Sequence, residues 1–517
     1  MSPEVPRPSR RAAAALAAAV VSAVLMTGCA AQSAGTADAA RADTLTVGSF
    51  SIDSVNPALV NNAVQVPRPA YETLLQQQDD GTYTGLLAES WSWDDDSYTA
   101  LTMTLRDGLT FSDGDTFDAD AVVGSIEYYQ SAQGPHAASY AGITVEKVGD
   151  DEVRIISATA NPDLPDLFAD TTWGGAIISP TGVADPTSLE TESHGIGEYV
   201  YSEMNAGVDY QLTANPDYPD QDAIHFDTID FVVLATESAQ TQALLSGQVE
   251  LVYSTLSSTW SQTVSGSSSL TLTDGLEAWN GLQLLDRDGT VVPALGDVRV
   301  RQAIMYALDR EAIATAVYGP DAQARVQAAN SNWLGFDEDL ESTYAYDPDK
   351  AKELLAEAGY ADGFTLPVAV TAGNAAEVLA QAIGGYLSAV GITLDIQTGT
   401  DAGSTVGLLF SHTVAAGFIP NSEASVNGYL NLQLLDGAGL NTLGQVDEGL
   451  QELYSAALVA NDQASWQAVL EYINENALTI PVVSAPDIWV STDEIDVSAA
   501  IKPTNGRFDI TEVVAAG

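Results

Sequence analysis

The sequence predicts an α/β fold spread over two or three domains, and three observations support that prediction. The chain has 517 residues, more than one ordinary hydrophobic core accommodates. Its 46% hydrophobic and 8% aromatic content is typical of a packed globular protein rather than a disordered one. Strand-like and helix-like patterns alternate along the chain, and after the first thirty residues it contains no heptads and no longer repeat.

The first thirty residues differ from the rest and predict a signal peptide. Arg7, Arg10 and Arg11 form a positive segment before the apolar stretch Ala12–Met26. A helix of that length spans about 22 Å, which is less than the ~30 Å hydrocarbon core of a bilayer. A signal peptide over residues 1–28 is therefore favoured over a membrane span.

Cys29 is the one cysteine of the chain and follows Leu25-Met26-Thr27-Gly28. This segment resembles a bacterial lipobox, with Met26 where leucine is usual. The resemblance implies cleavage before Cys29, a lipid on its sulfur, and anchoring on the extracytoplasmic face of the cell membrane. Residues 29–43, rich in Ala, Ser, Thr and Gly, then predict a flexible tether. The alternative for Cys29 is an ordinary buried thiol.

The charge balance excludes one class of partner. The chain carries 71 acidic and 17 basic residues, a formal net charge of −54. Nucleic-acid binding needs clustered Lys and Arg, so nucleic acid is not expected as a partner. Two interpretations of the acidic surface stay open, namely tolerance of salty surroundings and attraction of cationic solutes.

The individual elements follow from local patterns. Thr44–Gly48 and the alternating segment Leu101–Leu105 predict strands. Helical spacing over Val298–Val317, with Asp297 placed to cap its start, predicts one long helix. The remaining expectations are a helix over 349–358 opened by Asp347-Pro348 and ended by Gly359, a helix over 378–390 stopped by Gly391, a strand over 392–396, and a Ser/Thr-rich linker over 254–273.

Four sequence blocks, in order along the chain, carry a family resemblance. They are Leu86–Trp91 with Leu105–Gly114 and Asp118–Val122; Gly195–Tyr199 with Ala214–Tyr218; Asp297–Ala303 with Ala307–Arg310; and Tyr346–Tyr360. Together they resemble the bacterial extracellular solute-binding proteins of family 5, the oligopeptide-, dipeptide- and nickel-binding group. The sequence departs from the family pattern at Ile196, Glu198 and Pro219. In the first block, Asp113-Gly114 predicts a tight turn, Asp118 or Asp120 a helix cap, and Trp91 and Phe111 core residues.

The resemblance implies a fold and a function. The fold is a periplasmic-binding-protein-like flytrap (class II, cluster C) with two α/β lobes and an inserted extra domain. Domain I would comprise residues 44–60, 194–275 and 479–517, domain II residues 61–193, and domain III residues 276–478. The function would be that of an ABC-importer lipoprotein. It would act as a monomer that captures a peptide or peptide-like solute and delivers it to the permease, without catalysis, cofactor or metal.

The resemblance also indicates where the solute binds. The expected ligand-binding residues are Tyr71, Trp173, Trp279, Asn280, Phe418, Asn421 and Glu423. The aromatic members would form apolar walls and the two asparagines would hydrogen-bond, although each aromatic residue fits a core position equally well. Trp333 is expected either in a lid or in ordinary packing.

Glu423 bears on which class of solute the protein binds. Peptide-binding members of the family capture the peptide's amine with an aspartate in this late loop, but residues 415–423 contain none. Glu423 either takes that role or is an ordinary exposed carboxylate. An opine, a sugar or a metal chelate is therefore kept as the alternative solute.

Two further functional classes are alternatives to transport. A secreted hydrolase finds little support, because Gly-x-Ser-x-Gly, His-Glu-x-x-His and Walker motifs are all missing from the sequence. The four histidines, at positions 136, 194, 225 and 412, have no ligand-like spacing. A receptor or chaperone with the same fold and anchor is the other alternative.

Overall fold

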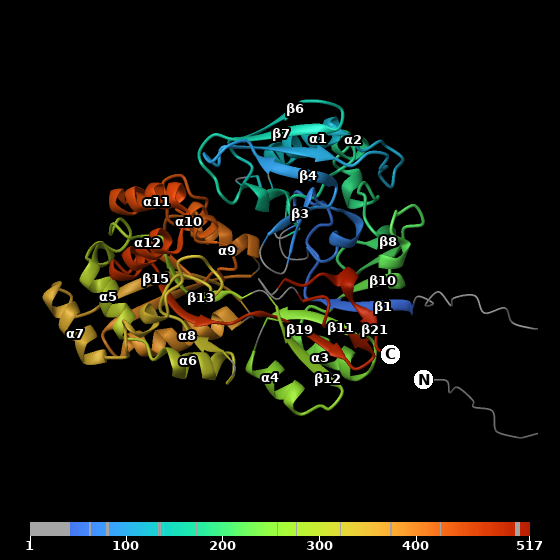
Figure 1. The fold of residues 1–517 in the computed structure, drawn as a ribbon. Coiled ribbons are helices and arrows are strands. Elements are labelled where there is room, and N and C mark those ends of the chain that lie inside the picture. The colour runs from blue at the N-terminus through green and yellow to red at the C-terminus, as the bar shows by residue number, and fades with distance from the viewer. Residues whose placement is uncertain are drawn as a thin grey trace, which may run out of the picture. The chain divides into compact units, whose positions relative to one another are not determined.

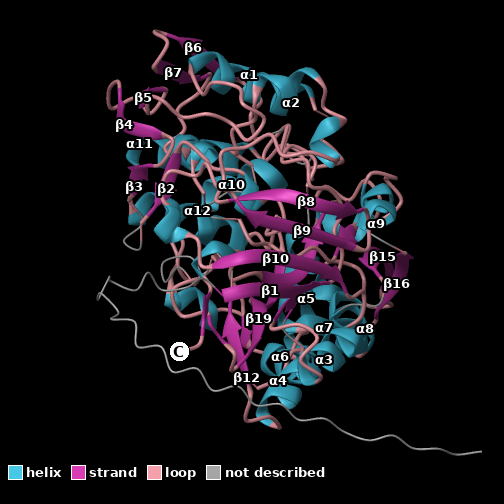
Figure 2. Cartoon of the chain, turned by 90° about the vertical axis from the view of Figure 1, so that its right-hand side faces the viewer, coloured by secondary structure: helices cyan, strands magenta, loops and turns pink. Residues whose placement is uncertain are grey.

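A seven-stranded mixed sheet gathers strands from both ends of the chain in the computed structural model. The structure describes residues 42–60, 64–78, 82–132, 134, 136–137, 139–170, 174–255, 257–275, 277–320, 322–372, 375–400, 402–423, 425–501 and 507–517, which belong to one compact unit. The order of the sheet is β12-β19-β11-β1-β10-β9-β8, and several of these ribbons lie side by side in Figure 2. Its strands are β1 (Ala42–Ser49), β8 (Tyr199–Asn205), β9 (Asp209–Ala214), β10 (Phe226–Val233), β11 (Leu251–Thr255), β12 (Leu270–Asp274) and β19 (Asp487–Thr492).

The predicted strand near residue 44 is confirmed at the centre of this sheet. β1 begins at Ala42, so the last two residues of the expected tether are already in the strand. It runs parallel to β10 and β11, and its side chains Leu45 and Val47 are fully buried. The signal peptide, Cys29 and the rest of the tether lie outside the described residues.

The expected linker over 254–273 is wrong. This segment contains the helix α4 (Ser258–Ser265) and leads into β12, beside the helix α3 (Glu237–Leu245). The Ser257 side chain caps α4 by accepting from the Trp260 N–H at 3.1 Å. Trp260 is fully buried and its indole N–H donates to Ser254 Oγ at 3.0 Å. The Ser/Thr-rich composition therefore reflects a helix cap and a half-exposed helix face rather than a linker.

A four-stranded antiparallel sheet, in the order β4-β5-β7-β6, forms a second layer. Its strands and neighbours are β4 (Ala88–Trp93), β5 (Ala100–Leu105), β6 (Ile143–Lys147), β7 (Glu152–Ser157), the pair β2 (Leu75–Gln77) and β3 (Tyr83–Gly85), and the helices α1 (Ala119–Ser131) and α2 (Pro180–Ala184). Asp118 caps α1 as predicted, accepting from the Ala121 N–H at 3.1 Å. Gly114 has φ +92°, as the predicted turn requires. Phe111 is buried, whereas Trp91 is only partly buried.

A six-stranded sheet, in the order β14-β18-β13-β17-β15-β16, lies among the remaining long helices (Figure 1). Its strands are β13 (Trp279–Leu284), β14 (Gln323–Ala324), β15 (Phe364–Thr371), β16 (Ile392–Gly399), β17 (Ala416–Gly417) and β18 (Ile480–Ser484). The helices are α5 (Val298–Tyr306), α6 (Arg310–Val317), α7 (Pro348–Glu357), α8 (Ala375–Ser388), α9 (Ala402–Leu409), α10 (Val426–Gln433), α11 (Glu448–Ala460) and α12 (Gln463–Glu475). A short pair, β20 (Ile495–Asp496) and β21 (Val514–Ala515), lies near the C-terminus.

The predicted helix over 298–317 is two helices, which corrects the sequence interpretation. α5 ends at Tyr306 and α6 begins at Arg310. Asp309 opens α6, because its carboxylate accepts from the Ala312 N–H at 3.1 Å and so favours a new helix start. The predicted cap at Asp297 is confirmed, and so are the helix-ending positions Gly359 (φ +90°) and Gly391 (φ +96°).

Residues 279–484 leave the seven-stranded sheet after β12 and return to it before β19. They therefore form a single excursion, which we call the distal body. It is joined to the rest by two crossing segments, whose described residues are 275 and 277–278 in the first and 485–486 in the second. The crossings run side by side: the Gly275 N–H donates to Asp487 O at 2.7 Å, and the Ala485 N–H donates to Ala278 O at 2.9 Å. β18 pairs with β13 inside this body, although it follows the expected boundary at residue 478. The full division into three domains stays a prediction.

Within the described part of the chain, none of the helices combines the length and the apolar character needed to traverse a bilayer.

Candidate functional site

Five of the predicted ligand-binding residues lie on two neighbouring segments of the distal body. Trp279 and Asn280 begin β13, and Phe418, Asn421 and Glu423 follow β17. The Trp279 N–H donates to Asn421 O at 3.2 Å, and the Asn421 N–H donates to Trp279 O at 3.0 Å. The sequence prediction therefore selected one local constellation next to a crossing segment.

Trp279 occupies a core position within this constellation. It is fully buried, and its ring meets Tyr429 of α10 edge-on with centroids 5.7 Å apart. Tyr429 also contacts Trp333, whose indole N–H donates to Glu423 O at 2.9 Å. Trp333 is 4% exposed, so in this structure it packs rather than forming an open lid. The aromatic cluster holds the loop that carries Glu423.

The polar residues of this constellation differ in how many hydrogen bonds their side chains make within the protein. Asn421 is 1% exposed; its Oδ1 accepts from Gln433 at 3.2 Å and its Nδ2 donates to Ile419 O at 2.9 Å. Asn421 therefore shapes its own loop. Asn280 is also buried and makes a longer bond to Ala278 O at 3.4 Å. Phe418 is buried beside Ala369, to whose carbonyl it donates at 3.0 Å.

Glu423 is the exception, because its partly buried carboxylate forms no ion pair with any cation among the described residues. Desolvation by burial raises the pKa of Glu423. A Cβ placed on Gly428 would lie 3.3 Å from Glu423 Oε2, so the carboxylate rests against the start of α10. A desolvated carboxylate without a cation is chemically suited to accept a charge-assisted hydrogen bond from an ammonium or guanidinium group.

Tyr71, another predicted site residue, does not join this constellation. Tyr71 is 2% exposed and lies against Gly195, where an added Cβ would be 2.6 Å from its ring. Burial raises the pKa of Tyr71, which belongs to the core around the seven- and four-stranded sheets. Trp173 lies outside the described residues, and its place in the site stays a prediction.

The sequence analysis missed Asp163, which approaches the same loop from the other side. It lies in the segment after β7, and its Oδ2 accepts from Ser425 Oγ at 2.5 Å and from Asn427 Nδ2 at 3.1 Å. Burial raises the pKa of Asp163. Because 262 residues separate Asp163 from Ser425, no local sequence signal could have revealed this contact.

A second missed cluster has the order of a hydrolytic triad. Ser188 Oγ lies 2.8 Å from His194 Nε2, and His194 Nδ1 lies 2.7 Å from Asp113 Oδ2. However, Ser188 Oγ also lies 2.7 Å from Asp185 O as a donor, and His194 is 1% exposed. Asp113 also accepts from Ser179, which caps α2. The geometry is that of a network that fixes the Asp113-Gly114 turn against the short helix at Ser188.

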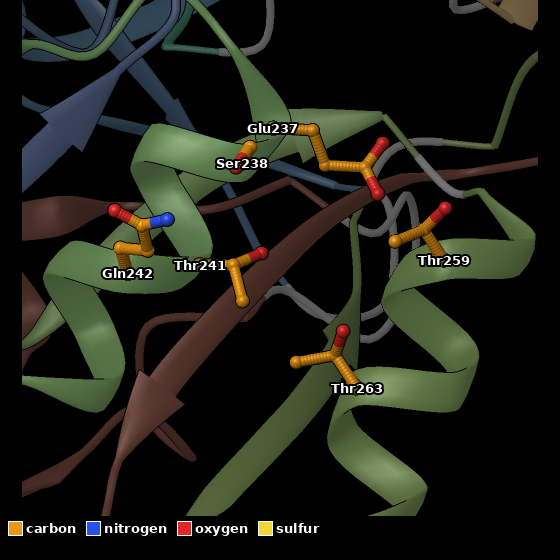
Figure 3. A pocket seen from close by; sticks show the side chains of 6 residues that line it. All are labelled: Glu237, Ser238, Thr241, Gln242, Thr259 and Thr263. Carbon is orange, nitrogen blue, oxygen red and sulfur yellow. The ribbon is translucent and has the colours of Figure 1, made fainter.

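A pocket of about 460 Å³ lies elsewhere, between α3 and α4 (Figure 3). It is lined by Glu237, Ser238, Thr241, Gln242, Thr259 and Thr263, none of which was predicted to bind the solute. Figure 3 shows these polar side chains on the two neighbouring helices α3 and α4. In the described part of the chain, no three His, Cys, Asp or Glu side chains are placed to hold a metal ion.

Comparisons with known proteins agree on one family. The profile of the bacterial extracellular solute-binding proteins, family 5 Middle, matches residues 82–417. Heme-binding protein A of Haemophilus influenzae is 27% identical over 315 residues, which cover 54% of this chain and 54% of that protein. The dipeptide-binding protein of Escherichia coli is 28% identical over 314 residues, 54% of this chain and 56% of that protein. The chain thus spans about half the length of these curated relatives.

Solved structures show the same fold over nearly the whole chain. The PBP AgaA from A. tumefaciens R10, in complex with agropinic acid, has a TM-score of 0.80 at 18% identity, covering 92% of this chain and 99% of that one. DppA from Helicobacter pylori, in complex with the peptide STSA, has a TM-score of 0.78 at 18% identity with the same coverage. The predicted α/β fold of the periplasmic-binding-protein type is confirmed.

Proposed function

Because the chain belongs to the bacterial extracellular solute-binding proteins of family 5, we propose that it is the solute-binding component of an ABC importer. It would enclose a peptide or peptide-like solute between the distal body and the rest of the chain and present it to the permease. The observation that carries this proposal is the pair of adjacent crossings at 275–278 and 485–486. Two short connections running side by side let one body rotate on the other, so a solute that contacts both bodies favours the closed arrangement.

Glu423 supports a solute with a cationic group. Its desolvated carboxylate has no cation beside it among the described residues, and a bound ammonium would supply one. The relatives include a dipeptide-binding protein and a neighbour crystallised with a peptide. The absence of an aspartate from residues 415–423, together with the agropinic acid complex of AgaA, makes an opine-like solute the second candidate.

Thermal unfolding of the soluble form, begun after Cys29, tests the proposal against separate pools of peptides, opines, sugars and metal chelates. A ligand present at 100 times its dissociation constant adds about 2.7 kcal/mol to the free energy of unfolding, which raises the midpoint measurably. A rise with peptides supports the first candidate, and a rise with opines alone supports the second. If no pool raises the midpoint, the proposed function is wrong.

The anchor is proposed on the sequence alone. We infer that cleavage before Cys29 leaves a lipidated, monomeric protein on the extracytoplasmic face of the membrane, where it meets the permease. It would bind its solute without converting it, as the binding proteins among its relatives do. Replacing Cys29 with Ser should move the protein from the membrane fraction to the soluble fraction. Retention of the Cys29→Ser variant in membranes would contradict the anchor.

A further inference from the structure

A small set of hydrogen bonds joins the two bodies outside the crossing segments. Asp163 follows β7 of the four-stranded sheet, whereas Ser425 and Asn427 begin α10 of the distal body. We call these three residues the latch. Asn427 Nδ2 also lies 3.4 Å from Asn161 Oδ1. If the bodies rotate apart about the crossings, as the proposed function requires, these bonds must break.

Hydrogen bonds within the distal body orient both donors of the latch, independently of Asp163. Ser425 Oγ accepts from the Gly428 N–H at 3.0 Å as the N-cap of α10, which leaves its proton free for Asp163. Asn427 Oδ1 accepts from Tyr454 OH and from Asn431 Nδ2, both at 2.9 Å. These two bonds fix which end of the amide faces Asp163, namely the donating Nδ2. Little side-chain freedom is therefore lost when the latch closes.

The acceptor is a carboxylate that meets only neutral donors in the latch. Closing removes water from Asp163, and the hydroxyl and amide must replace that water. Burial raises the pKa of Asp163, as expected for a carboxylate with incomplete compensation. If a donor is lost, the charge stays desolvated and unpaired, whereas loss of the carboxylate leaves only neutral groups unpaired. The first change is therefore the more costly for the closed arrangement.

We propose that Asp163, Ser425 and Asn427 form an inter-body latch that sets the equilibrium between the open and closed arrangements, and through it the apparent affinity for solute. Asp163 and Asn427 act as positioning residues that need not touch the solute. The proposal rests on the proposed function for the meaning of closure, but the equilibrium itself is measurable without solute.

The test uses the soluble form begun after Cys29, which contains no cysteine, so that two can be introduced for spin labels. Val148, between β6 and β7, and Val459, on α11, are exposed positions on the two bodies. Pulsed electron–electron double resonance measures the distance between spin labels attached to cysteines at both positions. Without solute, the short and long distances give the fractions of the closed and open arrangements. In this background, Asn427→Ala should raise the ratio of long to short distances about ten-fold, the effect of one lost charge-assisted hydrogen bond.

The pattern across variants distinguishes a latch from general damage. Asp163→Ala should open the protein less than Asn427→Ala, and the double variant should be more closed than Asn427→Ala alone. Asp166→Ala is the matched control, because Asp166 lies in the same turn as Asp163 and bonds to Tyr83 within its own body. Its distances should match those of the unmodified sequence. If Asn427→Ala does not fold, Ser425→Ala, which also removes one donor from Asp163, is measured in its place and should still lengthen the distance.

The outcomes separate the latch from the proposed function. Unchanged distances in Asn427→Ala and Asp163→Ala would overturn the latch, even if solute binds. An equal shift in Asp166→Ala would also overturn it. The expected shifts in a protein that binds no solute pool would support the latch and contradict the proposed function. Where solute binds, Asn427→Ala should raise the apparent dissociation constant by the factor by which it lowers the fraction of closed protein.

Discussion

Replacing Glu277 with Gln tests whether the crossing segments are anchored as the structure indicates. Glu277 lies in the first crossing and accepts from Arg325 Nη2 at 2.5 Å and from Ser484 Oγ, at the end of β18, at 2.6 Å. The N–H and hydroxyl of Ser331 donate to it at 3.0 and 2.6 Å. The side chain of Arg325 is 3% exposed and that of Glu277 is 23% exposed, so this is a largely buried ion pair. Glutamine keeps the shape and an accepting oxygen but removes the charge.

The size of the effect follows from what remains after the substitution. Breaking a buried pair by removing one charge costs about 3–5 kcal/mol, because the other charge is left uncompensated. Arg325 retains Glu341 at 3.4 Å and the ring of Phe336, 5.2 Å away, so part of the charge stays compensated. We expect a loss of about 2–3 kcal/mol in the free energy of unfolding at pH 7, at or below the lower limit of the 3–5 kcal/mol range for an uncompensated charge.

The stability that the Glu277 carboxylate contributes depends on pH. Burial alone would raise the pKa of Glu277, but the hydroxyls of Ser331 and Ser484 and the guanidinium of Arg325 outweigh it and hold that pKa below its usual 4.5. The native state therefore binds the proton less readily than the unfolded chain. The stabilisation is present above pH 4.5 and disappears as the pH falls through the lowered value.

Urea unfolding of the soluble form, followed at pH 7 and at progressively lower pH, measures this effect. Glu353→Gln is the control, because its partner Lys350 is 41% exposed and such surface pairs contribute at most about 1 kcal/mol. Unfolding of Glu277→Gln at the midpoint of the unmodified protein at pH 7 would contradict an anchoring role of Glu277. A loss of stability as large below the lowered pKa as at pH 7 would contradict it too.

Three further substitutions test the site and its surroundings. Trp279→Ala should destabilise the protein by about 3–5 kcal/mol, as expected for a buried aromatic residue, and calorimetry showing less than 1 kcal/mol would contradict the core position. Glu423→Gln should weaken the binding of a cationic solute at least ten-fold in titration calorimetry while leaving the unfolding midpoint unchanged or higher; unaltered affinity would remove Glu423 from the site. Burial raises the pKa of Glu72 to about 7, although the Tyr218 hydroxyl opposes the shift. The native state therefore binds this proton more tightly than the unfolded chain does, and the protein loses stability as the pH rises from about 4.5 to 7. Glu72→Gln should therefore be more stable than the unmodified protein at pH 8 by about 3 kcal/mol, and a constant difference between pH 5 and pH 8 would contradict this.

Much of the local structure could be predicted because its causes are local. Asp118 and Asp297 cap helices through bonds to residues two or three positions away, and Gly359 and Gly391 end helices with positive φ angles. Such signals are complete within a few residues of sequence. The same local chemistry explains one miss, since Asp309 was included in a continuous helical pattern although its side chain starts a new helix.

The errors in the site arise from tertiary contacts. The sequence pattern of an aromatic residue followed by a polar one, as at Trp279-Asn280, is compatible with a solute pocket and with a core. The structure decides between them, because Trp279 is fully buried and packs against Tyr429. The bonds of Asp163 to α10 connect segments more than 260 residues apart, so no pattern along the chain predicts them. Glu423 was selected by resemblance, and the structure adds that its carboxylate is desolvated.

Under the proposed function, the chain holds a solute and releases it unchanged. The most direct measurement incubates the soluble form with the pool that raises its unfolding midpoint, removes free solute by gel filtration, and analyses the bound fraction by mass spectrometry before and after denaturation. We expect one solute molecule per chain, recovered at its original mass after prolonged incubation. Cleaved products that accumulate with time, and only when the protein is present, would contradict this expectation and identify an enzyme.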